Sequence, residues 1–132
     1  MTDVQAAIDA AERILPGEAA APGEEDPRWL AIIKVSEILF TDEDPAPVWP
    51  FIERWGSLPD DDLSMAVAKC LLEHLLQKHF EVYFPKVASA AYANRWFADT
   101  VRACGSMAFR DQTANVERYN QLIRDLGENV AD

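Results

Sequence analysis

Residues 61–79, DDLSMAVAKCLLEHLLQKH, decide the fold that this sequence predicts. Apolar side chains recur at every third or fourth position, which is the spacing of one face of an α-helix. The apolar face is wide, and only a narrow polar stripe through Lys69, Glu73 and Gln77 interrupts it. A helix of this kind buries its surface against several neighbours, so we expect it at the centre of a helical domain.

Further helices are predicted on both sides of this central helix, and capping residues mark their boundaries. Asp26 and Pro27 suit the N-cap and the first position of a helix, and Pro85 opens another. Glycine at 56, 105 and 127 follows predicted helix ends. The expected helices cover residues 3–15, 26–40, 48–55, 61–79, 85–104 and 113–126. No segment alternates apolar and polar residues for long enough to predict a strand.

The predicted fold class is therefore all-α, with about six helices in antiparallel pairs. They form either an irregular bundle or a small HEAT-like stack. We expect a single domain over residues 1–132, in which residues 1–25 supply an N-terminal helix and a flexible linker and residues 26–132 supply the helical core. The helix over 26–40 is apolar on most sides, which predicts burial against more than one neighbour.

Composition points to a cytoplasmic protein that does not bind membranes. Of the 132 residues, 49% are hydrophobic, which suffices for one core without disulfides. The two cysteines, Cys70 and Cys104, lie in apolar helical patterns and lack CxxC spacing, so a disulfide framework or a zinc site is not expected. The N-terminus lacks the pattern of a signal peptide, and no apolar run reaches the length of a membrane span.

The net charge of −11 is confined to the N-terminal half. Residues 1–62 hold 15 acidic and 4 basic residues, whereas residues 63–132 hold 8 of each. Three acidic runs, at 24–26, 42–44 and 60–62, carry most of the excess. This distribution argues against nucleic-acid binding and favours a basic protein partner. The alternative interpretation is solubility and helix capping, because each run precedes a predicted helix.

Residues 67–101 resemble a group of small uncharacterised bacterial helical proteins. The shared pattern is a Leu-rich helix with an L-E-x-L-L-x-x-H core, followed by an aromatic residue and a second helix that ends in a segment containing phenylalanine. The matching residues here are Leu72, Glu73, His74, Leu75, Leu76, His79, Phe84, Val87 and Phe97. The resemblance implies a bacterial, cytoplasmic, helical protein and carries no activity with it.

No catalytic motif, cofactor site or metal site is predicted. His74 and His79 are five residues apart, so their side chains diverge around a helix instead of converging on a metal as in HExxH. His74 is expected in the core, bonded to a neighbouring carbonyl. Cys104 precedes a helix end beside Arg102, which leaves it open to solvent, whereas Cys70 between apolar neighbours is expected to be inert.

The aromatic residues allow two interpretations. Four tryptophans, with phenylalanines and tyrosines around them, either fill the core or form an aromatic-rimmed groove around the helix at 48–55. In the second case the acidic runs at 42–44 and 60–62 flank the groove, and the chain is a non-enzymatic interaction protein with a basic partner. An immunity protein that covers the basic active site of a nuclease is one concrete version. The predicted partner-binding residues are Asp42, Asp44, Trp49, Trp55, Asp60 and Asp61.

Two alternatives belong to other functional classes. The first is a small enzyme or ligand-binding domain with a pocket between the fourth and fifth helices. Its polar groups would be Glu73, His74, Tyr92 and Arg95. The second is a homodimer of structural role, in which the aromatic patch is buried against its twin.

Overall fold

The chain folds into helices, as predicted. The computed structural model describes the backbone of residues 3–129 and the side chains of residues 3–127, and this part contains no strand. Its α-helices are α1 (Asp3–Ile14), α2 (Pro27–Ser36), α3 (Val48–Trp55), α4 (Asp61–Val67), α5 (Glu73–Ala93), α6 (Arg95–Cys104) and α7 (Thr113–Asn129). Short 3-10 turns form at η1 (Glu37–Phe40) and η3 (Met107–Phe109). A π-helical segment, η2 (Ala68–Leu72), joins α4 to α5 without a break, so the described residues form six helical units.

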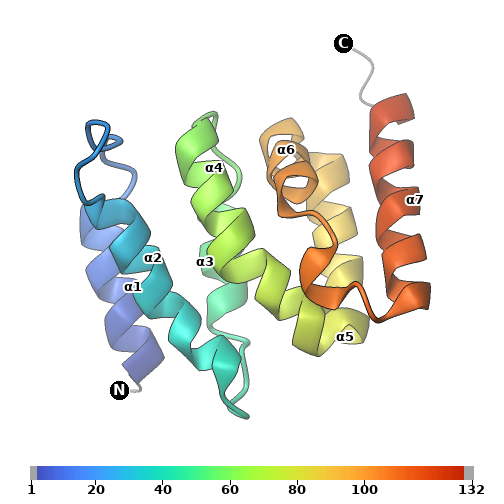
Figure 1. Cartoon of the computed structure of the whole chain (residues 1–132), viewed down its shortest axis with the longest axis horizontal. Coiled ribbons are helices and arrows are strands. Elements are labelled where there is room, and N and C mark those ends of the chain that lie inside the picture. Colours follow the sequence, from blue (N-terminus) through green and yellow to red (C-terminus); the bar gives the residue numbers. More distant parts are fainter. Residues whose placement is uncertain (1–2, 130–132) are drawn as a thin grey trace.

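The helices stand side by side in a row that follows the order of the sequence. Figure 1 shows α1 and α2 at one end, α3 to α6 in the middle and α7 at the other end. Within the part of the chain that the structure describes, each end of the row therefore has one side packed against the protein and one side without a neighbouring helix. No helix within residues 3–129 combines the length and the apolar character that crossing a membrane requires.

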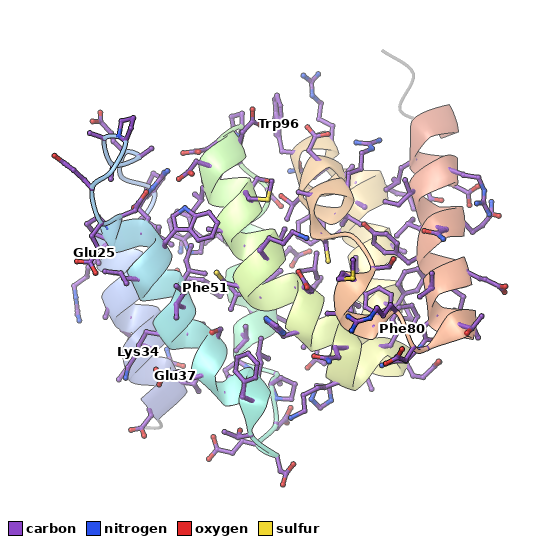
Figure 2. All side chains as sticks on the ribbon, viewed as in Figure 1. Glu25, Lys34, Glu37, Phe51, Phe80 and Trp96 are labelled. Atoms are coloured by element: carbon purple, nitrogen blue, oxygen red, sulfur yellow. The ribbon has the colours of Figure 1, made fainter. Side chains whose placement is uncertain are left out.

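The Leu-rich stretch at 61–79 lies at the centre of this row and supplies much of the core. Its leucines are almost completely shielded from solvent, and so is Phe97 of α6. The ring of Phe97 meets that of Trp49 edge to face, with 6.0 Å between the ring centroids. Figure 2 shows Phe51 in the interior as well, between α2 and α4 in this view. The predicted central position of the stretch is confirmed.

Two predicted helix starts are confirmed by their caps. The carboxylate of Asp26 accepts a hydrogen bond from the backbone N–H of Arg28 at 2.8 Å, with Pro27 at the first helical position. The carboxylate of Asp60 accepts from the N–H of Leu63 at 3.0 Å. Both aspartates have extended backbone conformations, as N-cap residues do. These acidic residues therefore satisfy donors that a helix start would otherwise leave free.

The prediction of one helix over 85–104 is wrong at its start and misses a break inside it, whereas its predicted end at Cys104 is confirmed. The preceding helix does bend at His79, whose φ of −134° and ψ of 39° are not helical, but helical structure resumes at once and runs through Pro85 to Ala93. The next boundary lies at Asn94, whose side chain accepts hydrogen bonds from the N–H groups of Trp96 and Phe97. An asparagine N-cap is a sequence signal in its own right. The alanine-rich pattern around it concealed the break.

The last helix also runs further than predicted. Gly127 was expected to end it near Leu126, yet α7 continues to Asn129. A glycine inside a helix is unfavourable by only about 1 kcal/mol relative to alanine, so helical hydrogen bonding can continue through it. Tyr119, Leu122 and Leu126 are buried and attach α7 to the rest of the row. The phenol of Tyr119 also donates a hydrogen bond to the carbonyl of Val101.

Candidate functional site

Arg28 is a charged residue inside the protein. It lies in the first turn of α2 and is only 1% exposed. Its guanidinium donates to the carboxylates of Asp60 at 2.8 Å and Asp62 at 2.5 Å, both at the start of α4, and to the carbonyl of Pro16 at 3.0 Å. Two ion pairs and a backbone contact converge on one side chain, which therefore joins the α1–α2 loop, α2 and α4.

The Arg28 contacts change the interpretation of two acidic runs. The runs at 24–26 and 60–62 come together here, because Asp26 caps α2 while Asp60 and Asp62 bind Arg28. The indole N–H of Trp29 adds a hydrogen bond to Asp62 at 3.2 Å. Asp60 thus binds within the protein, which corrects its predicted place on a free partner surface. Asp61, between the two paired carboxylates, is exposed.

The Asp60 carboxyl has a perturbed pKa. Burial alone would raise this pKa, but the hydrogen bond from Leu63 and the ion pair with Arg28 outweigh burial and leave it below its ordinary value. A pKa that is lower in the folded state stabilises the fold above the unfolded pKa of about 4, and this stabilisation is lost as the pH falls further.

We expect Asp60→Asn to reduce the pH dependence of stability. Asparagine keeps the N-cap but cannot pair with Arg28 as an anion. The difference in free energy of unfolding between wild type and variant, measured by urea denaturation, should be largest near pH 7 and shrink below about pH 4. Asp61→Asn, which removes one exposed charge beside Asp60, is the control for the change in net charge. A constant difference for Asp60→Asn at all pH values would contradict this assignment.

The second acidic run lies apart from the third. Asp42 and Asp44 occupy the loop before α3, whereas residues 56–60 follow α3, so the two runs lie at opposite ends of that helix (Figure 1). Both Asp42 and Asp44 are exposed, and Asp44 accepts a hydrogen bond from the N–H of Ala46. The two runs therefore flank α3 at its two ends, as the predicted groove requires, but Asp60 and Asp62 of the third run are engaged by Arg28.

The predicted aromatic rim is not formed. Trp55 is 5% exposed and Phe51 is also buried, so both belong to the core. Trp49 is half-buried, packs against Tyr83 and Phe97, and borders a shallow hollow beside Glu53. An eight-residue helix with three aromatics turns most of them inward because α1 and α4 pack against it. Of the two interpretations, core filling describes Trp55 correctly.

The alternative pocket does not form. Glu73 and His74 lie at the start of α5, whereas Tyr92 lies near its end and Arg95 follows the break at Asn94. Eighteen residues of this bent helix separate His74 from Tyr92. Tyr92 is 52% exposed. The ring of His74 packs against that of Phe40, with 4.8 Å between the ring centroids. The buried Nδ1 atom of His74 has no hydrogen-bond partner among the described residues, so the expected bond to a carbonyl is not made by this atom.

Cys104 does not have the open environment that the sequence predicted, whereas Cys70 keeps its predicted low reactivity. Cys104 is buried, and burial raises its pKa to about 12. Cys70 is the more accessible of the two, and burial followed by the charge of Glu73 raises its pKa as well. Neither thiol is therefore a ready nucleophile. Within the described residues, no group of three or more His, Cys, Asp and Glu side chains is placed to hold a metal ion.

A hollow of the described surface follows the seam between α1 and α2. We call it the N-terminal groove. One part measures about 680 Å³ and lies between the start of α1 and the end of α2, and an apolar part of about 360 Å³ continues it toward Ile14 and Leu30. The two parts share Ala7, Ala10 and Lys34, so they form one channel along the helices. Ile14 and Leu30 are 41% and 47% exposed.

The charged residues that line the N-terminal groove are mostly acidic. Asp3, Glu37 and Glu43 lie along it, and the single basic residue, Lys34, pairs with Glu37 at 3.3 Å. Figure 2 shows Lys34 of α2 and Glu37 of η1 where this segment adjoins α1, with Glu25 toward the other end of the helix pair. Residues 3–47 contain 11 acidic and 3 basic residues, of which Arg28 is buried. The groove therefore combines an apolar floor with an anionic rim.

The opposite end of the row has a different surface. Its exposed positions are small or polar: Thr113, Ala114, Glu117, Arg118, Asn120, Gln121 and Arg124. No large apolar side chain of α7 is exposed among those whose side chains are described. In stacked helical proteins a terminal helix with a polar outer face covers the core. By this comparison α7 closes its end of the row, while the α1–α2 end leaves apolar surface open.

Sequence reasoning missed the N-terminal groove, although its signal was present. The helix over 26–40 was expected to be buried on several sides because it is apolar nearly all round. In the structure Leu30, Ile33 and Phe40 are exposed, so burial on more than one side was wrong for these residues. An apolar helix face with no neighbouring helix indicates an interaction site as readily as a core.

Comparison with known proteins assigns this chain to no family. No protein-family pattern matches the chain, and neither a curated protein sequence nor a solved structure is significantly similar to it. The resemblance of residues 67–101 to small bacterial helical proteins stays a prediction.

Proposed function

We propose that this protein is a non-enzymatic interaction module that binds a basic protein partner through its N-terminal half. The observation that carries the proposal is the N-terminal groove, whose apolar floor is open and whose rim is anionic. The loop with Asp42 and Asp44 continues this rim, because Glu43 between them lines the groove. The proposal keeps the predicted partner and moves the binding surface away from Trp55 and Asp60.

Two physical effects support a basic partner. Apolar surface that leaves water on binding supplies affinity, and the carboxylates around it attract lysine and arginine and speed the encounter. Binding through such a rim weakens as salt screens the charges. A nuclease with a cationic active site is one class of partner that fits these charges.

A matched pair of variants tests the proposal. Asp3→Asn with Glu43→Gln removes two rim charges, and Asp111→Asn with Glu117→Gln removes two exposed charges at the α7 end. We expect wild type and the α7 variant to capture the same basic protein from cell lysate, and the rim variant to capture severalfold less, since an exposed ion pair contributes about 0.2–1 kcal/mol. Mass spectrometry identifies the captured protein, and surface plasmon resonance then measures its affinity.

Two results would refute the proposal. One is equal capture by the rim variant and the α7 variant, because the groove would then have no role. The other is a captured partner that is acidic or whose binding does not respond to salt between about 0.05 and 0.2 M. Circular dichroism of both variants checks that their helices are intact.

A further inference from the structure

We infer that the occupant of the N-terminal groove is an amphipathic α-helix of the partner, with lysine or arginine beside its apolar face. This inference rests on the proposed function and specifies the form of the partner. It follows from the shape of the groove, from the size of the residues in its floor, and from the signs of its charges.

The walls of the groove are two helix ridges. On α1 the lining residues Ala7, Ala10 and Ile14 recur at steps of three and four. On α2 the lining residues Leu30 and Lys34 have the same spacing, and Glu37 and Ile38 of the adjoining turn η1 also line the groove. Side chains at these spacings form the ridges of a helix surface, and the element that packs into the groove between two such ridges is a third helix. An extended strand would leave its backbone groups unpaired there, because neither wall offers a sheet edge.

The side chains in the floor of the groove are short, which lets a helix approach closely. Ala6, Ala7 and Ala10 line the groove on the α1 side. Small residues at a contact bring helix axes to the near end of the usual 8–10 Å separation. The apolar side chains of Ile14 and Leu30 would then contact the flanks of the incoming helix. α1 has 12 residues, about 18 Å, so a partner helix of roughly three turns fills the groove.

The charges decide between a partner and a second copy of this chain. A symmetric dimer through the groove would bring two sets of Asp3, Glu37 and Glu43 together, with Lys34 as the only basic residue on each side. Like charges placed against each other oppose association, whereas a cationic helix neutralises them. The groove therefore fits a basic helix better than it fits its own copy.

The probe is a synthetic peptide of leucine and lysine, about 14 residues long, with leucines at every third or fourth position. A control peptide of the same composition places its leucines at alternate positions, so that charge is kept and the helical apolar face is lost. Fluorescence anisotropy of labelled peptides measures binding near physiological salt, and circular dichroism follows helix formation. We expect the amphipathic peptide to bind about tenfold more tightly than the control and to gain helix on binding.

A substitution in the floor of the N-terminal groove tests whether the peptide binds there. Ala10 is exposed and lines both parts of the groove, so Ala10→Gln fills the channel with a polar side chain without adding charge. Glutamine is a good helix former, and α1 should remain intact. We expect about a tenfold loss of affinity for the amphipathic peptide, because the glutamine amide would lose water without a partner. Ala114→Gln, at an exposed alanine of α7, should leave the affinity unchanged.

The outcomes separate this inference from the proposed function. If both peptides bind equally and only the Asp3→Asn, Glu43→Gln variant weakens them, the acidic surface binds cations but not a helix, and the inference is wrong. If neither peptide binds, the inference is also wrong, while capture of a basic protein tests the function separately. If wild type is a dimer that Ala10→Gln converts to a monomer, as sedimentation would show, the occupant is a second copy and the inference is overturned.

Discussion

Arg28→Ala should lower the free energy of unfolding by about 3 kcal/mol, because it breaks a buried ion-pair cluster. The side chain is 1% exposed and serves Asp60, Asp62 and the carbonyl of Pro16. Removing it leaves two carboxylates without a counter-charge and an unfilled space in the protein. The carboxylate side chains keep 33% and 42% exposure, so water can solvate them in part, which places the effect at the low end of the range for such deletions.

Urea denaturation at pH 7 measures the effect of Arg28→Ala. Arg102→Ala is the matched control, because Arg102 forms an exposed ion pair with Asp99 on the surface of α6. The free energy of unfolding of this control should fall by less than about 1 kcal/mol. The triple variant Arg28→Met, Asp60→Asn, Asp62→Asn should lose less free energy of unfolding than Arg28→Met alone, because no unpaired charge remains in it. Equal losses for Arg28→Ala and Arg102→Ala would show that the cluster does not hold the loop, α2 and α4 together.

Phe97→Ala should be at least as destabilising, with an expected loss of about 3–5 kcal/mol. Phe97 is inaccessible to solvent and meets Trp49 from α3 and the backbone at Gly56. A Cβ atom at Gly56 would lie 3.2 Å from the Phe97 ring, so the space around the ring is already filled. Truncation therefore opens a cavity where α3, α6 and the central helix pack together, and this part of the core cannot close it without moving a helix.

The melting temperature of Phe97→Ala should fall by roughly 10 °C or more. Tyr92→Ala removes an aromatic ring that is half-exposed near the end of α5, and its loss should stay near 0.5 kcal/mol. Scanning calorimetry distinguishes the two variants. A melting temperature for Phe97→Ala equal to that of Tyr92→Ala would contradict the assignment of Phe97 to the core.

The sequence by itself determined the fold class and most helix boundaries of this protein. The apolar period of residues 61–79 placed the central helix, and the aspartates at 26 and 60 marked two helix starts. These features are local, because periodicity and capping depend on residues within a turn or two of each other. The break at Asn94 was also encoded locally, but the helical pattern on both sides of it concealed the cap.

Only the tertiary structure decided which of these residues are free to bind. Two acidic runs that look equivalent in sequence differ in space, because one is engaged by Arg28 from 32 residues away while the other remains exposed. Trp55 turned into the core and Leu30 turned outward, although both lie on apolar helix faces. The helical period of a sequence identifies the apolar face of a helix, but it does not identify the element that packs against this face. That element depends on contacts between segments that are distant in the sequence. The open groove at α1 and α2 is such a case, since no further helix among residues 3–129 packs against that end of the row.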